Sequence, residues 1–347
     1  MKILSIETSC DETACAVIED GRKVLANTIA SQIDIHAKTG GVVPEVAARE
    51  HVLKMIPVLD ECLEEAECSW DDIDALAITR GPGLISSLII GTETANVISY
   101  VKEKPLIPVQ HITGHIYSNW LGHDEEIKFP LLVLTVSGGH NEIILMRDHH
   151  HFEVLGESRD DAAGEAFDKV ARILGLGYPG GPIISKVALD GDSSAYSLPQ
   201  AMLEKGSMDF SFSGLKTAVL NEVKRYGSEK GLKDESEIDD KFKADIAASF
   251  QEAVNEVLAK KLLIAYEKYP EVKEVHIAGG VSANTRLREI VKEVFPDDVK
   301  LRCPGKISFC TDNAAMIGAS AYYLYKLDPG KYLPKTNITP TTSFEIG

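Results

Sequence analysis

The chain has 347 residues, of which 44% are hydrophobic and 26% charged, a composition typical of a globular protein large enough for two domains. No apolar run reaches the roughly eighteen residues that cross a bilayer, and the N-terminus lacks the apolar core of a signal peptide, so we expect a cytoplasmic protein without a membrane segment. A net charge of −17 excludes broad, nonspecific binding of nucleic acid, but it allows a local basic patch or a basic partner protein.

Alternating apolar and polar residues predict several short strands in the first third of the chain. Strands are expected at 2–9, 14–20 and 23–31, with the polar turn 10–13 at the tip of the first hairpin. The next predicted elements, in chain order, are a helix at 46–66, a strand at 74–80, a helix at 84–101, a strand at 105–110 and a helix that opens with HITGH at 111–115.

The pattern starts again near residue 130. Strands are predicted within 130–140, 141–148 and 152–158, then a helix at 160–176, and later a strand, a Gly-Gly turn and a helix within 272–295. An opening β-hairpin with a polar turn therefore occurs twice, which is a duplication of architecture rather than of sequence. We expect two similar α/β lobes that face a cleft, residues 1–128 and 129–324, and the C-terminal segment 325–347 can return to the first lobe.

Glycine-bearing turns stand where an α/β fold gathers ligands. They lie at 79–84, 135–140, 177–182 and 277–284. Glycine lets backbone N–H groups approach a ligand without interference from a Cβ atom. None of the turns matches the phosphate-binding P-loop or the dinucleotide pattern, and an ordinary tight turn is the alternative for each. Together they predict a nucleotide-like ligand at the ends of the strands.

The stretch HITGH places His111 and His115 one helical turn apart, where they can hold one metal ion. The zinc-protease pattern needs a glutamate directly after the first histidine, and this chain has Ile112 there. Asp312 is a candidate third ligand, with helix capping as the alternative. Two histidines and one carboxylate would form the facial set that suits Fe(II).

Other polar stretches are open to two interpretations. Asp11 and Glu12 at the hairpin tip could hold a cation or serve as general base, or they could simply favour the turn. The three consecutive histidines His149–His151 cannot all point one way, so this segment is predicted to be a solvated loop rather than a metal site.

The six cysteines contain no C-x-x-C pair and are expected to be reduced.

Nine segments in this order make the chain similar to a known family. They are SIETSCDETA, GGVVPEVAAREH, ITRGPGL, HITGH, TVSGGH, DDAAGEAFDKVARILGLGYPGGP, DFSFSGLKTAV, AGGVSAN and CTDNAAM. Together they resemble the bacterial branch of the TsaD (Gcp-type) family, the tRNA N6-adenosine threonylcarbamoyltransferases, from Met1 to about Leu327. The resemblance implies an actin/Hsp70/sugar-kinase-like fold, with two duplicated α/β lobes around a nucleotide cleft.

The resemblance also implies roles for particular residues. The metal ligands would be His111, His115 and Asp312, with iron as the expected metal and zinc or magnesium as alternatives. Asp11 and Glu12 would be the catalytic acids. The substrate contacts would be Thr135, Val136, Ser137, Gly138, Gly139, Asp168, Gly181 and Asn284. Two positions depart from the family, since Thr113 and Ser185 stand where relatives carry acidic residues.

The function implied is transfer of a threonylcarbamoyl group from threonylcarbamoyl-AMP to N6 of the adenosine 3′ of the anticodon, in tRNAs that read ANN codons. AMP leaves, and the metal assists without redox chemistry. Because the chain is so acidic, we expect partner proteins to supply part of the tRNA-binding surface. The resemblance implies that these partners are a TsaB-like paralogue and a TsaE-like ATPase. A small-molecule kinase of the same fold and a metalloprotease are the two alternatives.

Overall fold

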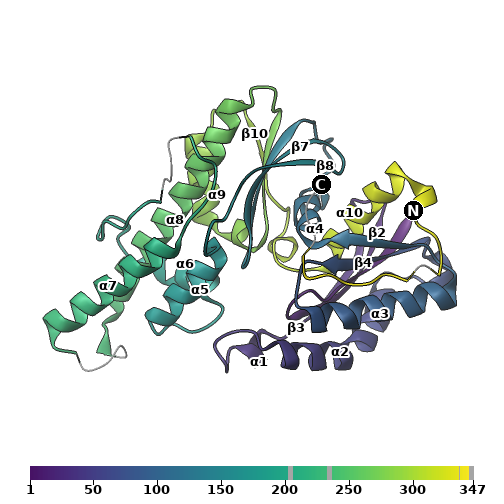
Figure 1. Ribbon diagram of the computed structural model, residues 1–347, viewed down its shortest axis with the longest axis horizontal. Helices are drawn as coiled ribbons and strands as arrows, with labels where there is room; N and C mark the ends of the chain where they lie inside the picture. Colours follow the sequence, from purple (N-terminus) through teal and green to yellow (C-terminus); the bar gives the residue numbers. More distant parts are fainter. Residues whose placement is uncertain (202–205, 233–236, 336, 344–347) are drawn as a thin grey trace.

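The computed structural model describes residues 1–201, 206–232, 237–335 and 337–343 of the chain. The strands form two separate five-stranded sheets. Figure 1 shows one sheet in each half of the molecule, with helices packed against both. The N-terminal third of the chain builds one lobe, and the stretch that follows it builds the other.

The first sheet has the strand order β3-β2-β1-β4-β5. Its strands are β1 (Lys2–Glu7), β2 (Glu12–Glu19), β3 (Lys23–Ser31), β4 (Ala75–Gly81) and β5 (Leu106–Gln110). Strand β1 runs antiparallel to β2 and parallel to β4, which in turn is parallel to β5. The carboxyl ends of β1, β4 and β5 therefore meet at one edge of the sheet, where α/β folds gather functional residues.

Helices cover both faces of this sheet because its strands are apolar on both sides. Along β1, Leu4 and Ile6 pack with helices α2 (Pro44–Glu65) and α3 (Ile85–Lys102), whereas Ile3 packs with α10 (Ala314–Leu327). The alternation follows from the period of two along a strand. Two short helices, α1 (Ile33–His36) and α4 (His111–Tyr117), complete this lobe.

The second sheet repeats the arrangement, in the order β10-β9-β6-β7-β8. Its strands are β6 (Leu131–Val136), β7 (Asn141–Asp148), β8 (His151–Glu157), β9 (Glu274–Ala278) and β10 (Lys300–Arg302). Strand β6 runs antiparallel to β7 and parallel to β9, as β1 does with β2 and β4. The predicted duplication of an α/β lobe is confirmed.

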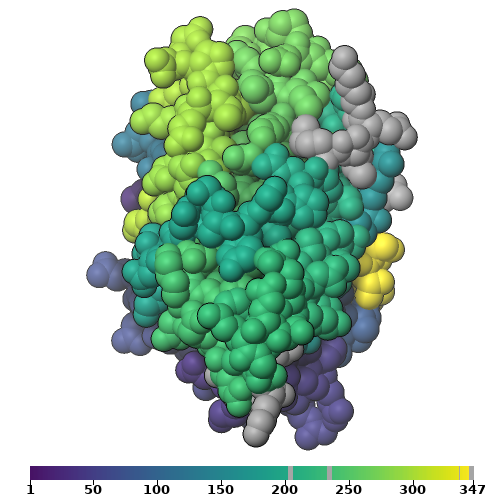
Figure 2. All heavy atoms as spheres, turned by 90° about the vertical axis from the view of Figure 1, so that its left-hand side faces the viewer, coloured from purple at the N-terminus to yellow at the C-terminus, as the bar shows by residue number. Residues whose placement is uncertain are grey.

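The second lobe carries the longest described helix, which the sequence patterns did not predict. Its helices are α5 (Ala163–Ile173), α6 (Gly180–Val187), α7 (Ser213–Lys230), α8 (Asp240–Lys268) and α9 (Thr285–Val294). Helix α8 is buried on all sides along 246–251, so it lacks the single apolar stripe that marks an amphipathic helix. In Figure 2, second-lobe residues in teal and green form most of the visible face, and the purple N-terminal residues lie behind its lower edge.

The prediction of a solvated histidine loop is wrong for two of its three residues. The His149 ring stacks on Tyr323 of α10 at 3.9 Å, and its Nδ1 lies 3.0 Å from the hydroxyl of Tyr117 in α4. His150 Nε2 lies 3.0 Å from the backbone oxygen of Ser320. Only His151 is exposed. The β7–β8 turn is therefore an aromatic contact between the lobes, and its rings do not converge on a metal site.

Three further points concern membrane-spanning helices, the cysteines and the lobe boundaries. Within the described ranges, no helix combines the length and apolar character needed to span a membrane. The six cysteines are all free thiols. The lobe boundaries at 128/129 and 324/325 stay predictions, although α10 packs against β1, β2 and α4 of the first lobe.

Candidate metal centre

The histidine pair stands at the functional edge of the first sheet because α4 begins directly after β5. The side chain of Gln110 caps this helix by accepting a hydrogen bond from Thr113 N at 2.7 Å. His111 is the first helical residue, and His115 follows one turn later on the same side. Both imidazoles are buried.

Gly114, between the two histidines, allows α4 to approach α10 closely. A Cβ atom on this residue would meet Ile317 Cδ1 at 2.7 Å and Met316 Cγ at 3.3 Å. The absence of a side chain therefore brings the start of α10 next to the histidines. The segment just before α10 contains Asp312.

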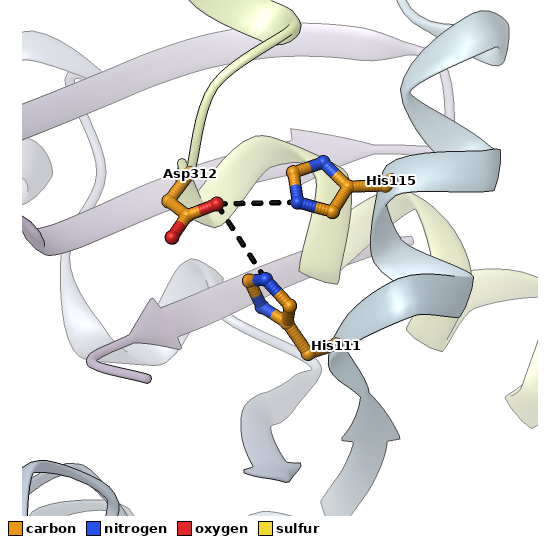
Figure 3. A group of neighbouring side chains, drawn as sticks. All are labelled: His111, His115 and Asp312. Atoms are coloured by element: carbon orange, nitrogen blue, oxygen red, sulfur yellow. Dashed lines mark ion pairs between the residues drawn. The ribbon is translucent and has the colours of Figure 1, made fainter. Parts of the chain in front are cut away.

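Asp312 is not the cap of α10, so the capping interpretation is wrong. The cap is Asn313, whose side chain accepts a hydrogen bond from Met316 N at 3.0 Å. The Asp312 carboxylate points instead between the two imidazoles (Figure 3). Its Oδ1 atom lies 3.2 Å from His115 Nε2 and 3.5 Å from His111 Nε2.

The three side chains have the geometry of a metal-ligand set. One ligand atom of each lies within 4.8 Å of the others. Nitrogen and oxygen ligands of one transition-metal ion, each about 2.1 Å from it, lie roughly 3.0–3.5 Å apart, which matches the two distances to Asp312. Nδ1 of the buried His115 has no hydrogen-bond partner among the described residues, and its Nε2 faces only the Asp312 carboxylate, as an ion pair at 3.2 Å. A bound cation would satisfy its Nε2, so the residues fit a metal ion.

The charges of this group favour a cation at the same point. Burial opposes ionisation, yet the carboxylates of Asp312 and Glu7 outweigh it and raise the pKa of His111. Burial likewise opposes the charge of Asp312, but the two histidines hold the pKa of this carboxyl below its usual range. A proton on His111 thus partly balances the carboxylates, and a divalent cation would displace it.

Glu7, which the sequence analysis did not single out, supports His111 from behind. This carboxylate has no exposure to solvent. It accepts hydrogen bonds from Ser9 N at 2.5 Å and from the hydroxyl of Thr79, and its Oε2 lies 3.2 Å from His111 Nδ1. The sequence signal that could have identified Glu7 is a charged residue at an inward position of a strand that is otherwise apolar. Glu7 thus leaves Nε2 of His111 as the atom that faces Asp312.

Asp11 and Glu12 stand at the tip of the first hairpin, as predicted, and approach the metal centre. Glu12 Oε1 accepts a hydrogen bond from Ser31 Oγ at 3.2 Å. Burial, then the negative charges of Asp312 and Asp11, raise the pKa of Glu12 well above its usual value. These three carboxyl groups therefore form one acidic cluster.

The predicted substrate turn of the second lobe follows β6. Thr135 and Val136 end the strand, and Ser137 N donates to His140 O at 2.8 Å to close the turn. A Cβ atom on Gly138 or Gly139 would meet nothing within 4 Å, so packing does not explain these two glycines. The open space beside their backbone fits the predicted approach of a ligand.

The other predicted contacts are engaged in the second lobe's own structure. Asp168 on α5 accepts a hydrogen bond from Gly180 N at 2.7 Å, which fixes the start of α6, while Gly181 faces open space. The Asn284 side chain caps α9 and donates to Gln251 Oε1 at 2.9 Å and Ser185 Oγ at 3.1 Å. Their contacts with substrate stay predictions.

The charges of the site affect the pKa values of two second-lobe side chains that the sequence analysis missed, Tyr178 and His140. Burial raises the pKa of the Tyr178 phenol, and the charges of Asp11 and Asp168 raise it further. Burial lowers the pKa of His140, and the charges of His111 and His115 add to this effect. Both belong to glycine turns that are predicted to act through their backbone, so the sequence pattern did not indicate a role for their side chains.

Duplicated mixed sheets, with a metal-ligand set at the carboxyl ends of the strands, define an enzyme of the actin/Hsp70/sugar-kinase fold class. The sequence model of the family "TsaD: tRNA N6-adenosine threonylcarbamoyltransferase" matches residues 23–319. The tRNA N6-adenosine threonylcarbamoyltransferase of Thermomicrobium roseum is 52% identical over 340 residues, covering 93% of this chain and 92% of the relative. That of Staphylococcus carnosus is 49% identical over 325 residues, covering 93% and 91%. The chain belongs to the TsaD family of transferases.

Solved structures support the fold class. Full-length HypF, in its phosphate- and nucleotide-bound form, matches with a TM-score of 0.58 and 14% identity, covering 95% of this chain and 47% of HypF. HypF from T. kodakarensis matches with a TM-score of 0.56 and 14% identity, covering 97% and 49%. At this level of identity the likeness concerns the fold alone, and it confirms the predicted two-lobed architecture.

Proposed function

We propose that the site between the two lobes transfers the threonylcarbamoyl group of threonylcarbamoyl-AMP to N6 of the adenosine 3′ of the anticodon, in tRNAs that read ANN codons. The observation that carries this proposal is the convergence of His111, His115 and Asp312 beside the hairpin acids, in a chain of the TsaD family. The N6 nitrogen forms a bond to the carbamoyl carbon, the bond from that carbon to the phosphate oxygen breaks, and AMP leaves.

His111, His115 and Asp312 would hold one divalent metal ion. Two nitrogen ligands and one oxygen ligand suit Fe(II) better than magnesium, which prefers oxygen ligands only, and zinc is the other candidate. The ion would supply a Lewis acid for the acyl phosphate end of the substrate. Glu7 would keep His111 in the tautomer that presents Nε2 to the ion.

Asp11 or Glu12 would take the proton that N6 loses as its new bond forms. The exocyclic amine is a weak nucleophile because its lone pair is delocalised into the ring, so a nearby base is required. Both carboxyl groups belong to the acidic cluster around Asp312. Their position at the hairpin tip supports this role.

The second lobe would bind the adenylate. The backbone N–H groups at Ser137, Gly138 and Gly139 would bind the phosphate and stabilise negative charge that develops at the carbonyl, since the space beside them is open. The end of β6 at Thr135 and Val136 and the second glycine turn at Gly181 would line the same ligand. Asp168 and Asn284 would contact it while they fix the starts of α6 and α9.

Partner proteins would complete the tRNA-binding surface of this acidic chain. Helices α2 and α3 lie side by side on one face of the first sheet (Figure 1). Both helices expose apolar side chains. Val52, Leu53 and Ile56 of α2 are 58%, 65% and 60% exposed. Contiguous exposed apolar residues mark protein interfaces. We assign this face to the TsaB-like paralogue, because a chain duplicated from the same lobe would present an equivalent helix pair. The TsaE-like ATPase would join the assembled pair.

The test of the reaction is mass spectrometry of nucleosides from unmodified tRNA that has been incubated with threonylcarbamoyl-AMP, partners and enzyme. Asp11→Asn and Glu12→Gln preserve shape and remove the candidate base. The variant that lacks the base should lose about 10²–10⁴-fold in kcat. Asp34→Asn changes an exposed acid of α1 and should leave the rate unchanged. Full activity in both hairpin variants would overturn this assignment of the base.

A further inference from the structure

A hollow lies at the junction of the two lobes, and it is lined by residues with no assigned role. Its volume is about 410 Å³. It is bounded by the β2–β3 turn, by the segment that leads from α4 to the second lobe, and by the segment before Asp312. The lining residues are Arg22, Lys23, Val24, Gly122, His123, Asp124, Lys306 and Phe309. Ligand sites in proteins span roughly 300–1,000 Å³, so the hollow is large enough for a nucleotide unit.

The lining is basic, in contrast to the chain as a whole. Three of its residues are cations (Arg22, Lys23 and Lys306), and Asp124 is its one acid. The full chain has 53 acidic and 36 basic residues, so cations without balancing acids are the exception here. The three cations come from two distant stretches of sequence, which the fold brings to one place.

The neighbouring carboxylates Asp20, Glu19 and Glu125 pair with groups other than Arg22 and Lys306, and Glu19 neutralises the lining residue Lys23. Asp20 pairs with the N-terminal amine at 2.8 Å, and Glu19 pairs with Lys23 at 2.8 Å. Glu125 pairs with Lys300 at 2.6 Å and with Arg302 at 3.3 Å. These pairs leave Arg22 and Lys306 as the cations that can act on a ligand.

Arg22 is held in place by uncharged groups. Its Nε donates to the Tyr323 hydroxyl at 3.2 Å, and its Nη1 donates to Glu125 O at 3.3 Å. Lys306 lies over the Phe309 ring at 5.7 Å from its centroid. Neither cation forms an ion pair with any residue that the structure describes. A guanidinium positioned by neutral acceptors keeps its charge and its remaining N–H groups for an anion.

The hollow is connected to the metal centre through the backbone. Phe309 lines the hollow and stands three residues before Asp312. Three residues span at most about 10 Å even when extended. A polynucleotide with one base at the metal centre would therefore bring phosphates of neighbouring nucleotides into this region.

We propose that this hollow binds a backbone phosphate of the tRNA substrate, through Arg22 and Lys306. A chain of net charge −17 can hold a polyanion only where its cations gather without acidic partners, and this hollow is such a place. A phosphate group could also come from a free mononucleotide such as the AMP product. The inference rests on the proposed tRNA reaction, and the experiment below separates the two.

The test compares the wild type with an Arg22→Gln/Lys306→Gln variant of the full chain. Binding of fluorescently labelled tRNA is titrated at several salt concentrations. The variant should bind tRNA about 10-fold or more weakly, and the slope of log K against log salt should be shallower by about 1 to 2. The control, Arg225→Gln/Lys241→Gln on exposed parts of α7 and α8, changes net charge equally and should match the wild type.

Two further measurements make the result decisive. Steady-state kinetics with partners should show a raised KM for tRNA and an unchanged kcat, which distinguishes lost binding from a failed reaction. Equal thermal melting of the variant and the wild type would establish that the fold is intact. Unchanged tRNA affinity and salt slope would overturn the proposal. So would loss of AMP or inorganic phosphate binding in the variant with tRNA binding unaffected, since that would assign the hollow to a free phosphate ligand.

Discussion

Glu7 Oε2 lies 3.2 Å from Nδ1 of His111, and the carboxylate is completely buried. A carboxylate behind a metal-binding histidine fixes the tautomer and the orientation of the ring. Here it joins the end of β1 to the start of α4, so the first sheet itself sets the direction of the His111 ring. The metal centre is thus part of the fold of the lobe.

Glu7→Gln should weaken metal binding without removing any ligand. The amide loses the negative charge that favours an N–H at Nδ1, so Fe(II) or Zn(II) affinity should fall about 10–100-fold. Calorimetric titration of the metal-free protein measures this directly. Glu153→Gln, at an exposed position of β8, is the matched control. Equal metal affinity in Glu7→Gln and the wild type would show that Glu7 does not position His111.

Gly114→Ala should disturb both the stability and the metal site. The added methyl group would overlap Ile317 and Met316, so α4 and α10 must separate. Such overpacking costs about 1–3 kcal/mol in the free energy of unfolding, and metal affinity should fall with it. Gly214→Ala in α7, where a Cβ atom meets nothing within 4 Å, is the control. Denaturant unfolding of both variants is the measurement, and a Gly114→Ala protein as stable as the wild type would contradict the close packing.

The histidine contact between the lobes should make stability depend on pH. Burial lowers the pKa of His149 to about 4 and that of His150 to about 3, from a usual value of 6.5. The unfolded chain therefore binds protons below pH 6.5 that the folded chain does not bind, so this stability is complete above pH 6.5 and declines as the pH falls toward 4.

Replacement of the half-buried His149 ring by one that cannot titrate tests the direction of this pH dependence. His149→Phe should show a smaller drop in Tm between pH 7 and pH 5 than the wild type. His151→Phe, at the exposed end of the same turn, should keep the drop of the wild type. Identical pH dependence in the wild type and His149→Phe would mean that this ring does not contribute.

The apolar face of α2 should be needed for the partner but not for the fold. Leu53→Glu/Ile56→Glu places charges on side chains that are 65% and 60% exposed, so the free energy of unfolding should change little. Size-exclusion chromatography with the TsaB-like paralogue should show no complex. Leu189→Glu, at an 81% exposed position of the second lobe, is the control. A stable complex with the α2 variant would assign the interface to another surface.

The sequence predicts most of this fold where local patterns decide the structure. The strands of both hairpins and the histidine helix follow from alternation and spacing over a few residues. Helix α8 was not predicted because burial on every side leaves no periodic apolar stripe in its sequence. The His149 turn was wrongly predicted to be solvated because its contact with Tyr323 joins residues far apart in the chain.

The candidate site, like the fold, was predicted where neighbouring residues decide the structure and was missed where contacts between distant residues decide it. The candidate ligand residues could be named from the sequence, but the preference for Asp312 as a candidate ligand rather than as a cap depends on Asn313, whose side chain occupies the cap. Tyr178 and His140 were missed because their relation to the site exists only after the two lobes are assembled. Glu7 was missed because its contact with His111 joins β1 to α4, which are about a hundred residues apart in the sequence.

The most direct test of the metal-dependent transferase compares the wild type, a His111→Ala/His115→Ala variant and a His151→Ala control. Each is assayed for bound iron and for threonylcarbamoyladenosine in digested tRNA, with partners and threonylcarbamoyl-AMP supplied. The wild type and the control should bind metal and form the product, and the double variant should do neither. Product formation at the wild-type rate by the metal-free double variant would contradict the role of these histidines in the reaction.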